Sequence, residues 1–237
     1  MRKSNISIFV PHIGCPQKCS FCNQNTITGQ TKAPAPQDVV DTVETALKSN
    51  KDNKYEYEIA FFGGSFTAID REYMVSLLEA AHPYVENGSV TGIRISTRPD
   101  FIDKDVLSLL KKYGVTAIEL GAQSMSNTVL RNNFRGHTAD DVRKASNMIR
   151  KNGFELGLQM MTGLYTSNRG LDVATAREFV KLKPKTVRIY PTVVLKGTYL
   201  ATLFETGKYT PPSLKKTIAL CAELVAFFEE HDIEVIR

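Results

Sequence analysis

Hydrophobic positions along the chain fall into two alternating patterns. Short runs of apolar and β-branched residues are separated by longer segments in which apolar residues recur every three or four positions. The short runs predict strands at residues 5–11, 56–62, 90–96, 115–121, 154–161 and 185–191. Because the helices between them return the chain to the same edge of a sheet, this alternation predicts an α/β fold with parallel strands.

Two of the intervening helices have clear start or stop signals. One predicted helix ends at Gly88, and its single apolar stripe consists of Met74, Leu77, Leu78, Ala81 and Val85. Another is predicted to begin at Thr138, because a hydroxyl there and the carboxylate of Asp141 can bind free backbone N–H groups. The pair Asn152–Gly153 is predicted to end this second helix.

Six consecutive βα units with short connections favour a partial (β/α)6 barrel of the TIM type. A doubly wound sheet is the alternative, and the pattern separates the two only weakly. In a barrel, the functional residues are expected at the carboxyl ends of the strands.

Composition adds bounds to this picture. The chain has 237 residues, of which 42% are hydrophobic and 23% charged, which fits one large or two small domains. The apolar run from Ile6 to Val10 is too short for a signal peptide or a membrane span, and no later run approaches the length of a span. We therefore expect a cytoplasmic protein without a membrane partner. The net charge of +5 is compatible with a polyanionic partner but more often reflects solubility.

Three cysteines stand close together directly after the first predicted strand. Cys15, Cys19 and Cys22 are spaced by four and three residues, near enough to bind three corners of one cuboidal iron–sulfur cluster. Thiols of a cytoplasmic protein are expected to be reduced and available to a metal. A fourth iron without a protein ligand can be chelated by the amino and carboxylate groups of a methionine moiety.

Two other kinds of metal site need a fourth ligand. A zinc knuckle requires another Cys or His, and a cluster that only transfers electrons requires another Cys. Cys221 is predicted to lie in the core, because it shares an apolar stripe with Ile218, Leu224, Val225 and Phe228. His12 is expected to pack or hydrogen-bond at a strand end rather than bind zinc.

The cysteine spacing, with the aromatic Phe21 before the last cysteine, resembles the signature of the radical S-adenosylmethionine (SAM) superfamily. The resemblance implies a 4Fe-4S cluster on Cys15, Cys19 and Cys22 that cleaves SAM to a 5'-deoxyadenosyl radical. It also implies a reduced flavodoxin or ferredoxin as electron donor. The segment Gly63–Gly64–Ser65 stands where this superfamily contacts the SAM methionine after the second strand.

Further segments resemble the catalytic subunit of the Elongator complex and, more loosely, oxygen-independent coproporphyrinogen oxidase. These segments are 96–100, 121–124, 135–138, 159–164 and 188–198, and Ser96 replaces the acidic residue usual at its position. The resemblance assigns Gln123 and Gln159 to SAM-facing positions and Arg135 to the SAM carboxylate. The full implied SAM-binding set is Phe21, Gly63, Gly64, Ser65, Ser96, Arg98, Gln123, Arg135 and Gln159.

Each of these assignments has a structural alternative. Arg98 and Arg135 could form surface salt bridges, and Gln123 and Gln159 could pair with backbone groups at strand ends. Residues 1–237 are expected to form one radical SAM core domain. The final segment, Glu234 to Arg237, reads as the opening of another strand, which suggests a chain truncated at its C-terminus, and no segment resembles the acetyltransferase domain of the Elongator subunit.

The sequence does not name the substrate. The likeness of residues 188–198 to the Elongator subunit favours a nucleoside in tRNA, bound beside the barrel mouth by nearby basic residues. These are Lys181, Lys183, Lys185, Arg188 and Lys196. The alternatives are a porphyrin-like or other small molecule and a zinc-containing, non-catalytic RNA-binding module.

Overall fold

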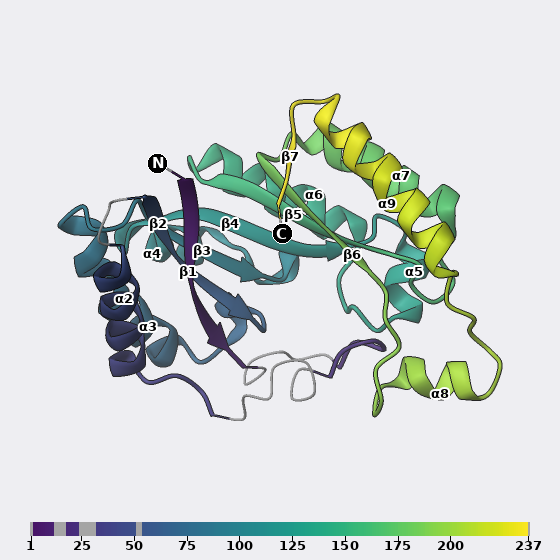
Figure 1. Ribbon diagram of the computed structural model, residues 1–237, viewed down its shortest axis with the longest axis horizontal. Coiled ribbons are helices and arrows are strands. Elements are labelled where there is room, and N and C mark those ends of the chain that lie inside the picture. Colours follow the sequence, from purple (N-terminus) through teal and green to yellow (C-terminus); the bar gives the residue numbers. More distant parts are fainter. Residues whose placement is uncertain (1, 12–17, 24–31, 51–53, 237) are drawn as a thin grey trace.

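The computed structural model describes residues 2–11, 18–23, 32–50 and 54–236 (Figure 1). Its centre is one parallel sheet in which the strands follow each other in sequence order, β1 to β7. The strands are β1 (Arg2–Val10), β2 (Tyr55–Gly63), β3 (Ile93–Thr97), β4 (Val115–Gln123), β5 (Glu155–Thr162), β6 (Thr186–Pro191) and β7 (Glu234–Val235). A doubly wound sheet would reverse its strand order at a switch point, so the sequential order excludes that alternative.

Helices cover the sheet between the strands. They are α2 (Pro36–Ser49), α3 (Arg71–Glu86), α4 (Lys104–Lys112), α5 (Asn127–Asn132), α6 (Ala139–Lys151), α7 (Arg169–Leu182), α8 (Tyr199–Glu205) and α9 (Leu214–Glu229), with short 3-10 helices at Phe66–Ala68 and Pro99–Phe101. In Figure 1, α2 and α3 lie beside β1 and β2, whereas α7 and α9 lie beyond β5 and β6. None of the helices in the described chain is long and apolar enough to cross a membrane.

This architecture confirms the predicted partial TIM-like barrel. All six predicted strands form, and the segment that begins at Glu234 adds β7 next to β6. The predicted helix stop and start signals are confirmed as well. Gly88 follows α3 with a φ of +74°, and Thr138 and Asp141 form a reciprocal capping box at the start of α6.

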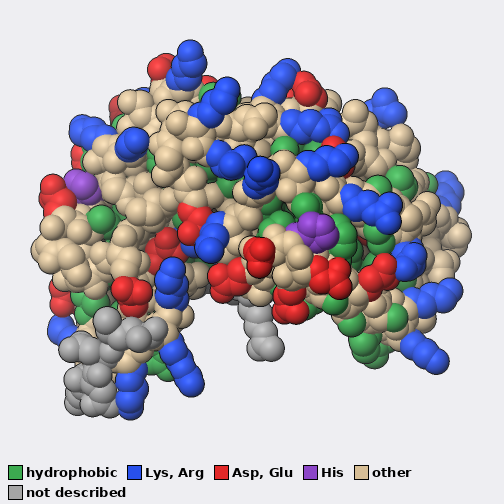
Figure 2. Space-filling view, turned by 90° about the horizontal axis from the view of Figure 1, so that it is seen from above, with side chains coloured by type: hydrophobic (Ala, Val, Ile, Leu, Met, Phe, Trp, Pro, Cys, Tyr) green, Lys and Arg blue, Asp and Glu red, His purple; other side chains and the backbone are tan. Residues whose placement is uncertain are grey.

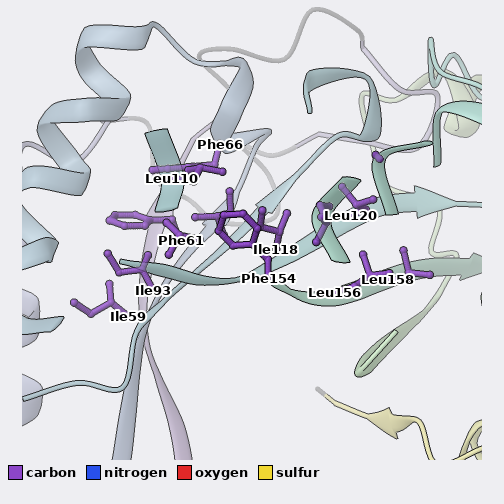
Figure 3. Packing of buried hydrophobic residues seen from close by; sticks show 14 of the residues in the cluster. Ile59, Phe61, Phe66, Ile93, Leu110, Ile118, Leu120, Phe154, Leu156 and Leu158 are labelled. Atoms are coloured by element: carbon purple, nitrogen blue, oxygen red, sulfur yellow. The ribbon is translucent and has the colours of Figure 1, made fainter. Parts of the chain in front are cut away.

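The core lies between the sheet and its helices, as Figure 3 shows for side chains from β2, β3, β4 and β5. Phe61 and Phe66 are nearly fully buried there, with their rings stacked at a centroid distance of 4.7 Å. Because side chains alternate along a strand, the neighbours of these apolar residues point to the other face of the sheet. In β3, for example, the apolar Ile93 and Ile95 alternate with polar residues, which are buried and face the inside of the partial barrel.

One prediction about the core is wrong. Ile218 of α9 is 59% exposed, whereas Leu224 and Phe228 of the same expected stripe are buried. At 100° per residue, Ile218 lies roughly 120° around the helix from Leu224, so both cannot face the sheet. Cys221 is only partly buried, and burial raises the pKa of its thiol.

Candidate active site

A cavity of about 460 Å³ lies where the strands end, at the mouth of the partial barrel. It brings together every predicted site residue that the structure describes. These are Cys19, Phe21, Cys22, Gly63, Gly64, Ser65, Ser96, Arg98, Gln123, Arg135 and Gln159. Cys15 and His12 lie outside the described residues.

Contacts from two distant segments hold the described part of the cysteine loop. The backbone N–H and the hydroxyl of Ser20 donate to the backbone and side-chain oxygens of Asn133, at 3.1 and 2.7 Å. The backbone N–H of Leu200, at the start of α8, donates to the Ser20 carbonyl at 2.7 Å. Asn133 is completely buried, so its contacts attach Ser20, which lies between Cys19 and Cys22, to the interior of the protein.

Arg135 lies directly against the cysteine loop. One guanidinium nitrogen is 3.1 Å from Cys19 Sγ, and another donates to the carbonyl of Gly121 at 2.5 Å. The side chain is 7% exposed, so the surface salt bridge considered from the sequence is wrong. The guanidinium therefore joins the cysteine loop to the end of β4.

The glycine pair has a structural reason of its own. Gly63 has a φ of +116°, and a Cβ there would collide with the backbone oxygen of Val10 and the ring of Phe9. The N–H of Gly64 donates to the same Val10 oxygen at 3.0 Å. Only glycine lets the ends of β1 and β2 approach this closely, and both glycines still line the cavity.

Buried hydroxyls connect the ends of β2 and β3. Ser65 Oγ lies 2.8 Å from Thr97 Oγ1 and accepts a 3.1 Å hydrogen bond from the N–H of Arg98. Thr97 Oγ1 also lies 2.6 Å from Thr67 Oγ1. Ser65 therefore supports the cavity wall in addition to lining it.

Arg98 is buried rather than on the surface. Its guanidinium donates to both carboxylate oxygens of Asp100, at 3.0 and 2.7 Å, and its exposed fraction is 3%. The salt bridge considered from the sequence therefore exists, between a buried guanidinium and a carboxylate whose residue is exposed. This pairing holds the arginine against the cavity.

Gln123 ends β4 in a strained conformation. Its φ is +65°, and the register of β4 against β5 shifts between Leu120 and Gln123. Left-handed backbone in a residue other than glycine costs about 1–3 kcal/mol and is often found at functional sites. The bulge directs the Gln123 side chain into the cavity instead of continuing the strand.

Three buried polar atoms at this cavity have no hydrogen-bond partner among the described residues. They are Arg98 Nη1, Gln123 Oε1 and Arg135 Nε. Buried polar groups are nearly always paired, so unpaired ones at a cavity indicate a polar ligand. Two donors and one acceptor fit SAM, which carries a carboxylate, an ammonium, ribose hydroxyls and adenine nitrogens.

A network of charged side chains forms the cavity floor, which the sequence analysis did not anticipate. Glu119, 1% exposed, accepts hydrogen bonds from Arg188 at 2.8 and 3.2 Å and from Gln159 Nε2 at 2.9 Å. Below it, Arg94 binds Glu58 at 2.6 Å and Glu155 at 2.8 Å. Although burial acts against the charge of Arg94, these carboxylates raise its pKa. Gln159 therefore pairs with side chains. The alternative considered from the sequence, in which it pairs with backbone groups at a strand end, is wrong.

The predicted basic surface for tRNA does not form. Arg188 is 7% exposed and bound to Glu119, so it cannot contact a phosphate at the surface. Lys181, Lys183 and Lys185 precede β6 and so lie at the end of the sheet opposite the cavity. Figure 2 views the molecule from the side where β1 begins, and basic side chains spread over that face while acidic ones gather near its middle. Lys196 alone of the five follows the carboxyl end of β6.

Sequence reasoning missed several residues of the cavity. Phe62 and Tyr190 line it, Glu119 forms its floor and Asn133 holds the cysteine loop. The available signal was strand alternation, because Glu119 and Arg188 are polar residues between apolar neighbours that face the helices.

Comparison with known proteins identifies the family of this chain. The family model for the radical SAM superfamily matches residues 9–178, and that for the radical SAM C-terminal domain matches 184–237. The tRNA uridine(34) acetyltransferase of Methanocaldococcus jannaschii is 30% identical over 65% of this chain, and Elongator complex protein 3 of Bos taurus is 32% identical over 71%.

The solved structure of an Elp3 from the archaeon Methanocaldococcus infernus superposes with a TM-score of 0.75 at 20% identity over all of this chain, which shows a common fold. The matches cover 32% and 35% of the two relatives and 57% of the archaeal Elp3 chain, so this chain spans from a third to just over half of their lengths. On the match of the superfamily model to most of its length, the chain belongs to the radical SAM superfamily, a superfamily of enzymes.

Proposed function

We propose that this protein binds a 4Fe-4S cluster through Cys15, Cys19 and Cys22 and cleaves SAM reductively. The observation that carries the proposal is the single cavity that Cys19 and Cys22 share with the predicted SAM-binding residues. Arg135 joins the two parts, since its guanidinium lies 3.1 Å from Cys19 Sγ and one of its nitrogens is still unpaired among the described residues.

When bound, the cluster supplies one electron that breaks the sulfonium C–S bond of SAM, giving methionine and a 5'-deoxyadenosyl radical that takes a hydrogen atom from the substrate. Arg135 binds the SAM carboxylate through the nitrogen that is unpaired. Arg98 and Gln123 contribute further polar contacts, and Gly63 and Gly64 leave room for the methionine end.

The floor of the cavity has a separate role in the proposal. The Glu119–Arg188–Gln159 network fills the barrel below the cavity with paired groups. It closes that side to bulk water without leaving an unpaired charge near the radical. The electron comes from a reduced flavodoxin or ferredoxin in the cytoplasm, and residues 1–237 act together as one radical SAM core domain.

The proposed substrate is a nucleoside in tRNA. Support comes from the relative named tRNA uridine(34) acetyltransferase, which covers 65% of this chain. Because this chain spans only 32% of that relative, acetyl transfer is not part of the proposal. The proposed reaction is limited to the radical step at the nucleoside.

Deleting the gene and analysing total tRNA nucleosides by mass spectrometry tests the substrate. We expect one modified nucleoside to disappear in the deletion strain and to return with the wild-type gene. Complementation with Cys22→Ala is the matched control and should not restore it. An unchanged nucleoside profile would contradict the tRNA substrate.

A further inference from the structure

Two aromatic side chains are exposed side by side near the mouth of the barrel. Phe134, between α5 and α6, is 43% exposed, and Tyr199, the first residue of α8, is 49% exposed. Their ring centroids are 5.0 Å apart with an interplanar angle of 45°. We call them the aromatic pair.

Both members of the aromatic pair are next in sequence to residues that contact the cysteine loop. Phe134 stands between Asn133, which binds Ser20, and Arg135, which contacts Cys19. Tyr199 precedes Leu200, whose N–H donates to the Ser20 carbonyl at 2.7 Å. A molecule that rests on these rings is therefore within one residue of the groups that hold the loop.

The backbone of Phe134 ends α5 as a left-handed C-cap, in which the N–H of Arg135 donates to the Leu130 carbonyl at 3.0 Å. Its φ is +54°, a left-handed conformation that is unusual for a bulky aromatic residue. Glycine is the usual residue at this position of a helix end, whereas here the position carries an aromatic ring that is 43% exposed. The cap therefore fixes where the Phe134 ring stands at the surface.

Exposed basic residues lie in the cysteine loop and in the two segments that carry Phe134 and Tyr199. Lys18 precedes Cys19 in the cysteine loop, Arg131 is one helical turn before Phe134, and Lys196 lies shortly before Tyr199. The N–H2 group of Asn23 donates to the Lys196 carbonyl at 3.3 Å, which joins that segment to the cysteine loop. Glu205, at the far end of α8, is an exposed acidic residue of this region.

We infer that the aromatic pair is a stacking platform for an unpaired base of the substrate RNA, with Lys18, Arg131 and Lys196 contacting the adjacent phosphates. The inference rests on the proposed tRNA substrate and assigns its binding surface. Exposed rings flanked by cations suit RNA, because bases stack on aromatic faces while lysine and arginine bind the backbone. The same charges fit an acidic electron-transfer protein less specifically, because such a partner does not need two adjacent exposed rings.

Fluorescence anisotropy with an anticodon stem-loop RNA that carries unmodified uridine at position 34 tests the inference. Phe134→Ala and Tyr199→Ala should each weaken binding by roughly five- to a hundredfold, as expected for the loss of one stacked base. Tyr199→Phe keeps the ring and should bind within about twofold of wild type. The matched control is Tyr55→Ala, which removes an exposed ring, 40% accessible, at the start of β2 and away from the mouth.

A salt series separates stacking from phosphate contacts. Lys18→Ala and Arg131→Ala should each reduce the log–log salt slope by about 0.7, whereas the aromatic variants should leave the slope unchanged. Wild-type affinity in both Phe134→Ala and Tyr199→Ala would overturn the inference and leave the proposed function standing. If these variants bind RNA normally but cleave SAM more slowly with reduced flavodoxin as the electron donor, the aromatic pair would be a binding site for the donor. That result would also overturn the inference. No RNA binding by the wild type would overturn both this inference and the tRNA substrate.

Discussion

Arg135 is the residue on which the proposed SAM site depends most. It is buried, it touches Cys19, and its Nε has no partner among the described residues. Arg135→Ala should therefore weaken SAM binding by about ten- to a hundredfold, the effect of losing a charge-assisted hydrogen bond of about 1.5–3 kcal/mol. Equilibrium dialysis with the cluster-loaded protein measures this.

The control for Arg135 is Arg143→Ala, which breaks an ion pair with Glu178 in which the arginine side chain is 43% exposed. This variant should bind SAM like the wild type. Unchanged SAM affinity in Arg135→Ala would remove that residue from the site.

The cysteines make a second prediction at this scale. Changing Cys15, Cys19 or Cys22 to Ala should abolish iron binding, because two thiolates hold a cuboidal cluster far less tightly than three. Cys221→Ala should retain the iron, since Cys221 is on α9 and does not line the cavity. Iron and sulfide analysis after anaerobic reconstitution gives the answer, and loss of iron from Cys221→Ala would refute the three-ligand site.

His137 makes stability depend on pH. Burial, with a smaller contribution from Arg135, lowers its pKa to about 4, below the value of about 6.5 in the unfolded chain. As the pH falls from 6.5 towards 4, the unfolded state binds the proton first, so the free energy of unfolding decreases, by about 3 kcal/mol at most.

Urea denaturation of wild type and His137→Gln at pH 7 and pH 4.5 checks this. The variant has no imidazole to protonate, so its stability should fall less between the two pH values. An equal fall in both proteins would show that His137 does not cause the pH dependence.

The separate helices and strands were the most predictable part of this chain. Their signals are local: the apolar stripe of α3 and the capping box of Thr138 and Asp141 each lie within a few residues of sequence. The stripe of α9 misled because Ile218 fits a spacing of three and four residues but faces away from the sheet. The spacing of apolar residues predicts that a helix has an apolar face. It does not show which part of that face another element of the protein covers.

The end of β2 gives a prediction that compares two glycines. Gly63 and Gly88 both have positive φ, but a Cβ on Gly63 would collide with β1, whereas a Cβ on Gly88 would meet nothing within 4 Å. Gly88→Ala should cost about 1 kcal/mol, from backbone strain alone. Gly63→Ala should cost at least about 2 kcal/mol more, because β1 and β2 must separate.

Thermal or urea unfolding of both glycine variants measures the difference. Equal losses of stability would mean that the contact between Gly63 and Val10 is not required, which would contradict the structural account of the glycine pair.

At the scale of the whole molecule, the barrel and most of the cavity residues were predictable, because the carboxyl ends of parallel strands meet at one edge. Long-range pairs were not. Ser20 binds Asn133 across 113 positions and Arg188 binds Glu119 across 69, and no local pattern contains either pair. The lysines before β6 were assigned to the mouth of the barrel because they are close in sequence to the residues that follow β6. The whole length of β6 separates them from the mouth.

The central claim is that the three-cysteine loop and the cavity together form a SAM-cleaving site. The most direct test is anaerobic reconstitution with iron and sulfide, followed by reduction and quantification of 5'-deoxyadenosine formed from SAM. The account predicts about four irons per chain, a broad absorption near about 400 nm, and 5'-deoxyadenosine that is absent with Cys19→Ala. Bound zinc without iron, or a full cluster in reduced protein that forms no 5'-deoxyadenosine, would contradict it.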